Sequence, residues 1–97
     1  MIADTIKIPS EDQKLQFPGQ PFVSKAKNKK YSVYVMRDGK RRLIHFGDRR
    51  YGQYRDKLGA YASLDHNDER RRRSYYARHG PAEDRNTAKY WAHRILW

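Results

Sequence analysis

The sequence predicts a small α+β domain in which a β-hairpin packs against two or three short helices, with an extended N-terminal arm before it. Three observations predict this fold. Residues 31–46 contain two runs of strand-forming residues around a turn signal. Two later segments, residues 65–78 and 86–97, each begin with residues that cap helices. The length of 97 residues corresponds to a single domain.

Residues 1–28 are predicted to form the arm together with a basic linker, and residues 29–97 the compact basic domain. Residues 1–23 contain three prolines, and their apolar residues follow neither the period of a strand nor that of a helix. They carry two lysines against three acids, a net charge of −1, which leaves +12 for the rest of the chain. The arm is expected either to dock on the domain or on a neighbouring subunit, or to be a frayed terminus.

The hairpin is predicted from Tyr31–Met36 and Arg41–Phe46, which the turn-forming pair Asp38–Gly39 connects. A two-residue turn at this pair fixes the register of the two strands. The predicted pairs on one face are Val35 with Arg42, Val33 with Ile44, and Tyr31 with Phe46. The apolar members of these pairs are therefore expected to meet the core, while the opposite face is mixed and partly solvated.

The segment after the hairpin, residues 49–64, favours only one or two short helical turns, because its two glycines lower the helix propensity. A helix capped by Asp65 or Asp68 is predicted to follow. It runs to about Arg78, where Gly80-Pro81 stops it.

A last helix is predicted to begin at Asn86 or Thr87. Its apolar stripe, at spacings i, i+3, i+4 and i+7, consists of Ala88, Trp91, Ala92 and Ile95. Since a two-stranded hairpin is not stable alone, we expect this stripe to cover the apolar face of the hairpin. The arginine-rich helix is then left on the outside.

The charge balance indicates a polyanionic partner. The chain has 22 Lys and Arg against 11 Asp and Glu, a formal net charge of +11. Nucleic acid, anionic lipid and acidic protein are the partner classes that such an excess attracts. No apolar run approaches the roughly 20 residues of a membrane span, so we expect no membrane partner. The absence of cysteine excludes disulfides and thiolate metal sites.

The sharpest local feature is the run of four arginines from Arg70 to Arg73. On a helix, four consecutive residues span about 300° of the circumference, so they form a collar and not a stripe. One interpretation is contact with phosphate, which a guanidinium grips with two hydrogen bonds. The other is a solvated helix face that forms salt bridges to nearby acids. The residues predicted to contact nucleic acid are Arg70, Arg72, Arg73, Lys40, Arg41, Arg42, Arg49 and Arg50.

No motif for reading base sequence is present, so contact with the phosphate backbone, of DNA in the first place, is expected. For catalysis, the chain offers neither a glycine-rich phosphate loop nor a cysteine nucleophile. A nuclease site built from His66, Asp68 and His79 is an alternative that nothing in the pattern requires. No pair of histidines has the i, i+4 spacing of a helical zinc site. We therefore expect no enzyme activity, no metal, no cofactor and no small-molecule substrate.

The C-terminal two-thirds, Lys29 to Trp97, carries an ordered set of short patterns. They are YSVYV from Tyr31, IHFG from Ile44, HxDxxR from His66, YxxRH from Tyr75, TAxYW from Thr87 and the final LW. In this set the chain resembles a family of small uncharacterised proteins of large DNA viruses and tailed phages. Residues 55–64 look like an insertion, and Lys89 stands where that family usually has glycine. The resemblance implies a viral or phage source and a compact α+β unit, and it implies no reaction.

The residues of these patterns have two physical interpretations, a buried polar brace or a phosphate site. We predict the brace, because Asp and His at helical spacing more often satisfy one another. Its predicted members are His66, Asp68, Arg71, Tyr75, Arg78, His79, Trp91 and Trp97.

The first functional hypothesis is a structural protein of a virus or phage particle, such as a capsid, portal or head-tail connector component, made in the host cytoplasm. Its basic body would face DNA, and residues 1–28 would dock on neighbouring virion proteins. The alternative is a free accessory protein that binds nucleic acid without sequence specificity during infection. A pure assembly protein, with the arginine collar against an acidic protein surface, is a further possibility.

Overall fold

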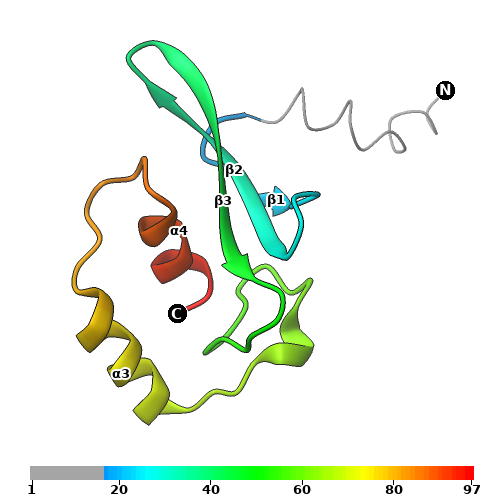
Figure 1. The fold of residues 1–97 in the computed structure, drawn as a ribbon, viewed down its shortest axis with the longest axis vertical. Coiled ribbons are helices and arrows are strands. Elements are labelled where there is room, and N and C mark those ends of the chain that lie inside the picture. The colour runs from blue at the N-terminus through cyan, green and yellow to red at the C-terminus, as the bar shows by residue number, and fades with distance from the viewer. Residues whose placement is uncertain (1–16) are drawn as a thin grey trace, which may run out of the picture.

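A computed structural model describes residues 17–97 of the chain (Figure 1). The predicted α+β class is confirmed: a three-stranded antiparallel sheet of order β1-β2-β3 precedes two helices. The elements are β1 (Phe22–Val23), β2 (Lys29–Arg37), β3 (Lys40–Asp48), a single 3-10 turn η1 (Ala62–Leu64), α3 (Glu69–His79) and α4 (Ala88–Ile95).

The hairpin of β2 and β3 has the predicted register. Tyr31 pairs with Phe46, Val33 with Ile44, and Val35 with Arg42. The turn at Asp38 and Gly39 uses φ angles of 52° and 75°, which is the left-handed region that this residue pair adopts most readily. The mixed face is partly solvated as expected, with Met36 and Leu43 about half exposed at 48% and 42%.

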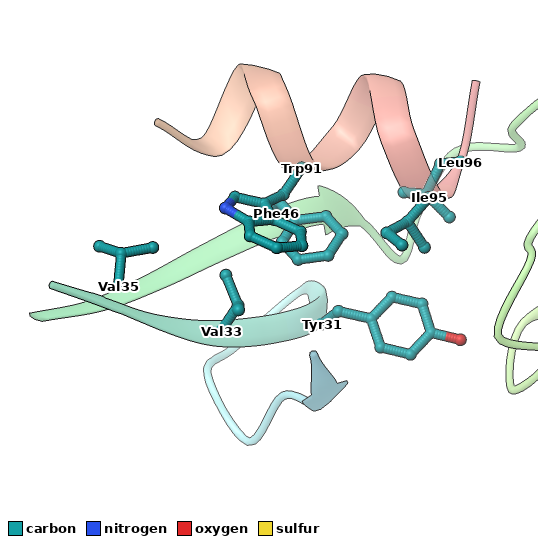
Figure 2. Close-up of a cluster of buried hydrophobic side chains, with 7 residues drawn as sticks. All are labelled: Tyr31, Val33, Val35, Phe46, Trp91, Ile95 and Leu96. Carbon is teal, nitrogen blue, oxygen red and sulfur yellow. The ribbon is translucent and has the colours of Figure 1, made fainter. Parts of the chain in front are cut away.

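The core lies between α4 and the sheet, as the apolar stripe of the last helix predicts. Figure 2 shows Trp91 and Ile95 of α4, with Leu96 just after it, above the strand residues. The strand side of this core consists of Tyr31, Val33, Val35 and Phe46. Burying such side chains contributes roughly 1.5–3 kcal/mol each, so this cluster is the main source of stability.

The helix ends follow the predicted capping, and the structure selects between the alternatives. Asp68, and not Asp65, caps α3: its carboxylate accepts hydrogen bonds from the backbone N–H groups of Arg70 and Arg71. Gly80, at φ 69°, ends that helix. Thr87, and not Asn86, caps α4 through a hydrogen bond from the Tyr90 N–H.

Part of the predicted arm belongs to the sheet. Phe22 and Val23 form β1, an edge strand that the sequence interpretation did not predict, and the Phe22 ring stacks on Tyr34 at 5.8 Å. The Gly19 N–H also donates to the Tyr34 carbonyl at 2.8 Å. The predicted boundary after residue 28 therefore cuts through packed structure. The rest of the predicted arm, residues 1–16, lies outside the described residues.

The predicted basic linker ends in the loop that connects β1 to β2, and β2 begins with two further lysines, of which the second is buried. Lys30 is 1% exposed, and its Nζ donates to the Tyr51 carbonyl at 2.8 Å and to Oε1 of Gln53. Burial lowers the pKa of Lys30, an effect that the nearby carboxylates of Asp56, Asp48 and Asp65 oppose. Lys30 therefore holds the loop after β3 and adds nothing to the exposed basic surface.

The long segment between β3 and α3 is fixed by buried polar contacts. Nε2 of Gln53, which is fully buried, donates to Oδ1 of Asp65 at 2.6 Å. The hydroxyl of Tyr31 donates to Oδ2 of Asp56 at 2.6 Å, and burial together with this hydrogen bond raises the pKa of Tyr31 well above its usual value. Residues 55–64, which look like an insertion by sequence, thus contribute a buried carboxylate and the Tyr61 ring to the folded domain.

Candidate nucleic-acid interface

The four consecutive arginines of α3, Arg70 to Arg73, have different surroundings. Arg72 turns toward the protein: its Nε donates to the Trp97 carbonyl at 2.7 Å, and its guanidinium lies 5.1 Å from the Tyr54 ring and 5.4 Å from the Tyr76 ring. Arg73 is exposed. Arg70 and Arg71 line a groove. The predicted phosphate contact at Arg72 therefore falls on a side chain that is engaged within the fold.

This groove lies between α3 and the Tyr51–Gly52 segment. It encloses about 440 Å³, and a second hollow of about 400 Å³ shares Tyr51, Gly52, Arg78 and Trp97 with it. We call this pair of hollows the α3 groove. Its arginine rim consists of Arg70, Arg71 and Arg78, and its ring-bearing side chains include Tyr51, His66 and Trp97.

The arginine rim is exposed and weakly paired. Arg71 lies 3.8 Å from the Asp68 carboxylate, and both side chains are about half exposed or more, at 66% and 45%. Within residues 17–97, the structure records no ion pair for Arg70 or Arg78. Long, exposed ion pairs contribute little, so the interpretation of a helix face neutralised by internal salt bridges has little support here.

Two stacked rings form the floor of the α3 groove. Tyr75 of α3 and Trp97 lie parallel, with ring centroids 4.2 Å apart and planes at 4°. The Tyr75 hydroxyl lies 3.0 Å from Nδ1 of His93, whose Nε2 lies 2.9 Å from the Gly80 carbonyl oxygen. Burial raises the pKa of Tyr75 to about 12. The floor is thus rigid and stays uncharged over the ordinary pH range.

The predicted brace exists in part. The His66 ring contacts Trp97, with ring centroids 5.3 Å apart, and the His79 ring contacts Tyr75, with centroids 4.3 Å apart. Trp91, in contrast, belongs to the sheet core against Phe46. Asp68 caps α3 from an exposed position, and Arg71 and Arg78 belong to the arginine rim.

His66 has one ring nitrogen engaged and one without a partner. Its Nδ1 accepts a hydrogen bond from the Asp68 backbone N–H at 3.0 Å. Its Nε2 is buried and has no hydrogen-bond partner within residues 17–97. Desolvation and the positive charge of Arg71 lower the pKa of His66, which favours the neutral ring.

The second predicted basic cluster lies elsewhere. Lys40, Arg41 and Arg42 belong to the hairpin tip, which we define as these residues with Arg37. Figure 1 shows the tip at one end of the molecule's long axis and α3 at the other. The two clusters therefore do not form one surface. Arg41 lies over the Tyr34 ring at 4.1 Å.

The last two predicted contacts, Arg49 and Arg50, immediately precede Tyr51 and are both exposed. Arg50 forms two hydrogen bonds to the Asp48 carboxylate, at 3.0 and 2.8 Å. These bonds hold the pKa of Asp48 well below its usual range. Arg49 is exposed and lines neither hollow of the α3 groove, whereas Arg50 is paired with Asp48.

Sequence reasoning missed Tyr51, Gly52 and His93 as parts of the site. For Gly52 the sequence did contain a signal, because a glycine within a segment can mark a close approach of two stretches of backbone. A Cβ at this position would lie 2.9 Å from the Leu64 carbonyl oxygen, so only glycine lets this segment approach the one before α3. No local signal indicates His93, because its partners Tyr75 and Gly80 come from another element.

Within the described residues, no group of three or more His, Cys, Asp or Glu side chains is placed to hold a metal ion. A helix with the length and apolar character needed to cross a bilayer is likewise not found there. Comparison of the chain with protein-family models, curated proteins and solved structures finds no match.

Proposed function

We propose that this protein binds the phosphate backbone of nucleic acid, without sequence specificity and without catalysing a reaction, through the α3 groove. The observation that carries this proposal is the arginine rim. Arg70, Arg71 and Arg78 come from one helix, are exposed, and surround a hollow instead of a flat face. Guanidinium groups in such an arrangement suit phosphate, because each presents donors in a fixed fork.

The net charge of the chain supports the same partner class. A formal charge of +11 on 97 residues raises the local concentration of polyanions around the whole molecule. The groove then supplies the specific contact, and the remaining cations supply long-range attraction that salt screens.

The setting we propose is a virus or phage particle, where the protein is a structural component of the capsid, portal or head-tail connector. The resemblance to small proteins of DNA viruses and tailed phages supports this setting. The basic surface would face packaged or passing DNA, and residues 1–16 of the arm would contact neighbouring virion proteins. Mass spectrometry of purified particles tests it: absence of the protein from intact particles contradicts the structural role.

A free accessory protein made during infection is the second candidate. One observation favours it: every residue that lines the α3 groove lies between Lys30 and Trp97, so binding needs no contribution from the arm. A variant lacking residues 1–16 should therefore bind nucleic acid like the full chain in either setting. Only the particle role should require the deleted segment.

The binding proposal is tested by titrating duplex DNA across salt concentrations. Each phosphate contact contributes a slope of about −0.9 in the logarithm of affinity against the logarithm of salt. The variant Arg70→Gln/Arg71→Gln/Arg78→Gln should bind more weakly, with a slope shallower by up to about 2.7 units.

The matched control removes the same charge from the hairpin tip, as Arg37→Gln/Lys40→Gln/Arg42→Gln. Both variants lower the formal net charge of +11 by three. The tip variant should keep most of the native affinity and slope. Equal losses in both variants would mean that only net charge matters. No binding by the folded native chain would contradict the proposal and direct the search to an acidic protein partner.

A further inference from the structure

We infer that the α3 groove receives an unpaired nucleotide, so that the preferred ligand is single-stranded nucleic acid. In this arrangement the base enters the groove beside Tyr51 and Trp97, and the adjoining phosphates lie on the arginine rim. The inference rests on the proposed phosphate binding and adds the class of nucleic acid to it.

The first observation is the exposure of Tyr51. Its side chain is 65% exposed at the edge of the groove, and the ring contact that the structure records for it is the Arg50 guanidinium, 5.8 Å from the centroid. An exposed tyrosine beside cations is a usual platform for an unpaired base. A base within a duplex is covered on both faces by its neighbours, so it cannot stack on such a ring.

The second observation is the fixed floor. Trp97 has one face covered by Tyr75 at 4.2 Å, yet it remains half-buried and lines both hollows of the groove. The ring is therefore held in place before any ligand arrives, which reduces the ordering cost of binding. The volume of about 440 Å³ falls within the roughly 300–1,000 Å³ of ligand pockets.

The third observation is the unpartnered nitrogen of His66. Because the Asp68 N–H donates to Nδ1, the neutral ring carries its proton on Nε2. This N–H donor is buried and has no acceptor within residues 17–97, although its ring lines the groove. An unsatisfied buried donor is costly, and Nε2 is closed to solvent in the unbound protein. A base carbonyl or ring nitrogen in the groove would satisfy it if the ring edge opens toward the groove when the ligand binds.

The charged rim completes the site. Arg70, Arg71 and Arg78 lie around the same hollow as the two aromatic rings and His66. Base stacking and phosphate contact are thus available within one groove, which is how proteins hold single strands without reading sequence. A rim that only gripped duplex phosphate would have no need for an exposed tyrosine beside it.

The test compares three DNA ligands of equal length and phosphate number by fluorescence anisotropy: a single strand, its duplex, and the single strand with abasic sites in place of bases. The native chain should bind the normal single strand more tightly than the abasic one. Tyr51→Ala should weaken binding of the normal single strand by about 5- to 150-fold and leave the abasic strand unaffected.

Two control variants accompany Tyr51→Ala. Tyr51→Phe keeps the ring and should bind like the native chain. Phe17→Ala removes another exposed aromatic, 69% exposed and outside both hollows, and should also have no effect. Circular dichroism establishes that each variant is folded.

The outcomes separate this inference from the proposed function. Equal binding of normal and abasic strands, unchanged in Tyr51→Ala, overturns the nucleotide site and leaves phosphate binding in place. Tighter binding of the duplex than of the normal single strand also overturns the nucleotide site and leaves phosphate binding in place. Failure of the native chain to bind any of the three ligands overturns both.

Discussion

The hairpin tip and the α3 groove are both rich in basic residues, but only one of them has the construction of a binding site. The tip presents Arg37, Lys40 and Arg42 as exposed side chains on a narrow two-stranded ribbon. The α3 groove sets its arginine rim around a hollow with a stacked aromatic floor. Positive charge alone therefore does not locate the interface. We therefore base the proposed interface on the combination of charge, ring surface and concave shape at the α3 groove.

The largest expected difference between the two regions is in what they contribute to stability. Tyr75→Ala removes a buried ring that stacks on Trp97, so it should lower the free energy of unfolding by about 3–5 kcal/mol. Leu43→Ala, near the tip at 42% exposed, should change it by no more than about 0.5 kcal/mol. Urea denaturation of both variants measures this. Similar effects would contradict the idea that the groove is built on a fixed core.

A smaller effect is expected from two lysines that look alike in the sequence. Lys30→Ala leaves the Tyr51 carbonyl and Gln53 without their donor and should cost about 1–3 kcal/mol. Lys40→Ala at the tip should cost about 0.5 kcal/mol or less. Thermal unfolding at one pH compares the two. If Lys30→Ala proves as stable as the native chain, the polar network does not hold the Tyr51 side of the groove.

Loss of the α4 cap should lower the free energy of unfolding by about 1 kcal/mol, which is typical of a helix N-cap. This helix leads directly into Trp97 of the α3 groove. Thr87→Ala loses the hydrogen bond from the Tyr90 N–H, whereas Thr87→Ser keeps the hydroxyl and should lose much less. Chemical denaturation of the pair isolates the hydrogen bond from the change in size. An equal loss in both would attribute the effect to the missing methyl group.

The smallest expected effect is a dependence of the free energy of unfolding on pH, since it comes from the single carboxylate of Asp56. Burial of Asp56 opposes its ionisation, but hydrogen bonds from Tyr31, Tyr61 and Leu58 outweigh this and lower its pKa below the usual 3.8. A lowered folded pKa stabilises the fold above about pH 4, and this contribution is lost as the pH falls through the folded value.

The comparison of native chain with Asp56→Asn measures this contribution. The native chain should be the more stable at about pH 6, and the difference should narrow toward about pH 2. Denaturation midpoints across that range give the result. A constant difference at every pH would show that the Asp56 charge is not what stabilises the loop.

The sequence predicts the local part of this fold well, because the signals are local. Asp38–Gly39 determines the hairpin register, and the candidate caps include Asp68 and Thr87. Arg72 and Tyr76, four residues apart on α3, are also in contact, with the guanidinium 5.4 Å from the ring centroid. The two-residue strand β1 is too short to show any periodicity, so its prediction was not possible by the same means.

The site is less predictable, because it depends on where segments meet. The collar of arginines is visible in the sequence, but which members face the groove is decided by Trp97, which accepts a hydrogen bond from Arg72 and stacks on Tyr75. Lys30 reads as part of a basic surface and is buried, because its acceptors come from a segment more than twenty residues away. Only tertiary contacts carry this information.

Binding in the α3 groove is tested directly by observing which residues respond when nucleic acid binds. Amide chemical shifts, together with the two indole N–H signals, are followed by NMR while a short single-stranded oligonucleotide is added. We expect shifts at Tyr51, Gly52, Arg70, Arg71 and the Trp97 indole, with little change at Asp38, Gly39 and the buried Trp91 indole. Shifts confined to the hairpin tip, with the α3 groove unchanged, would contradict it.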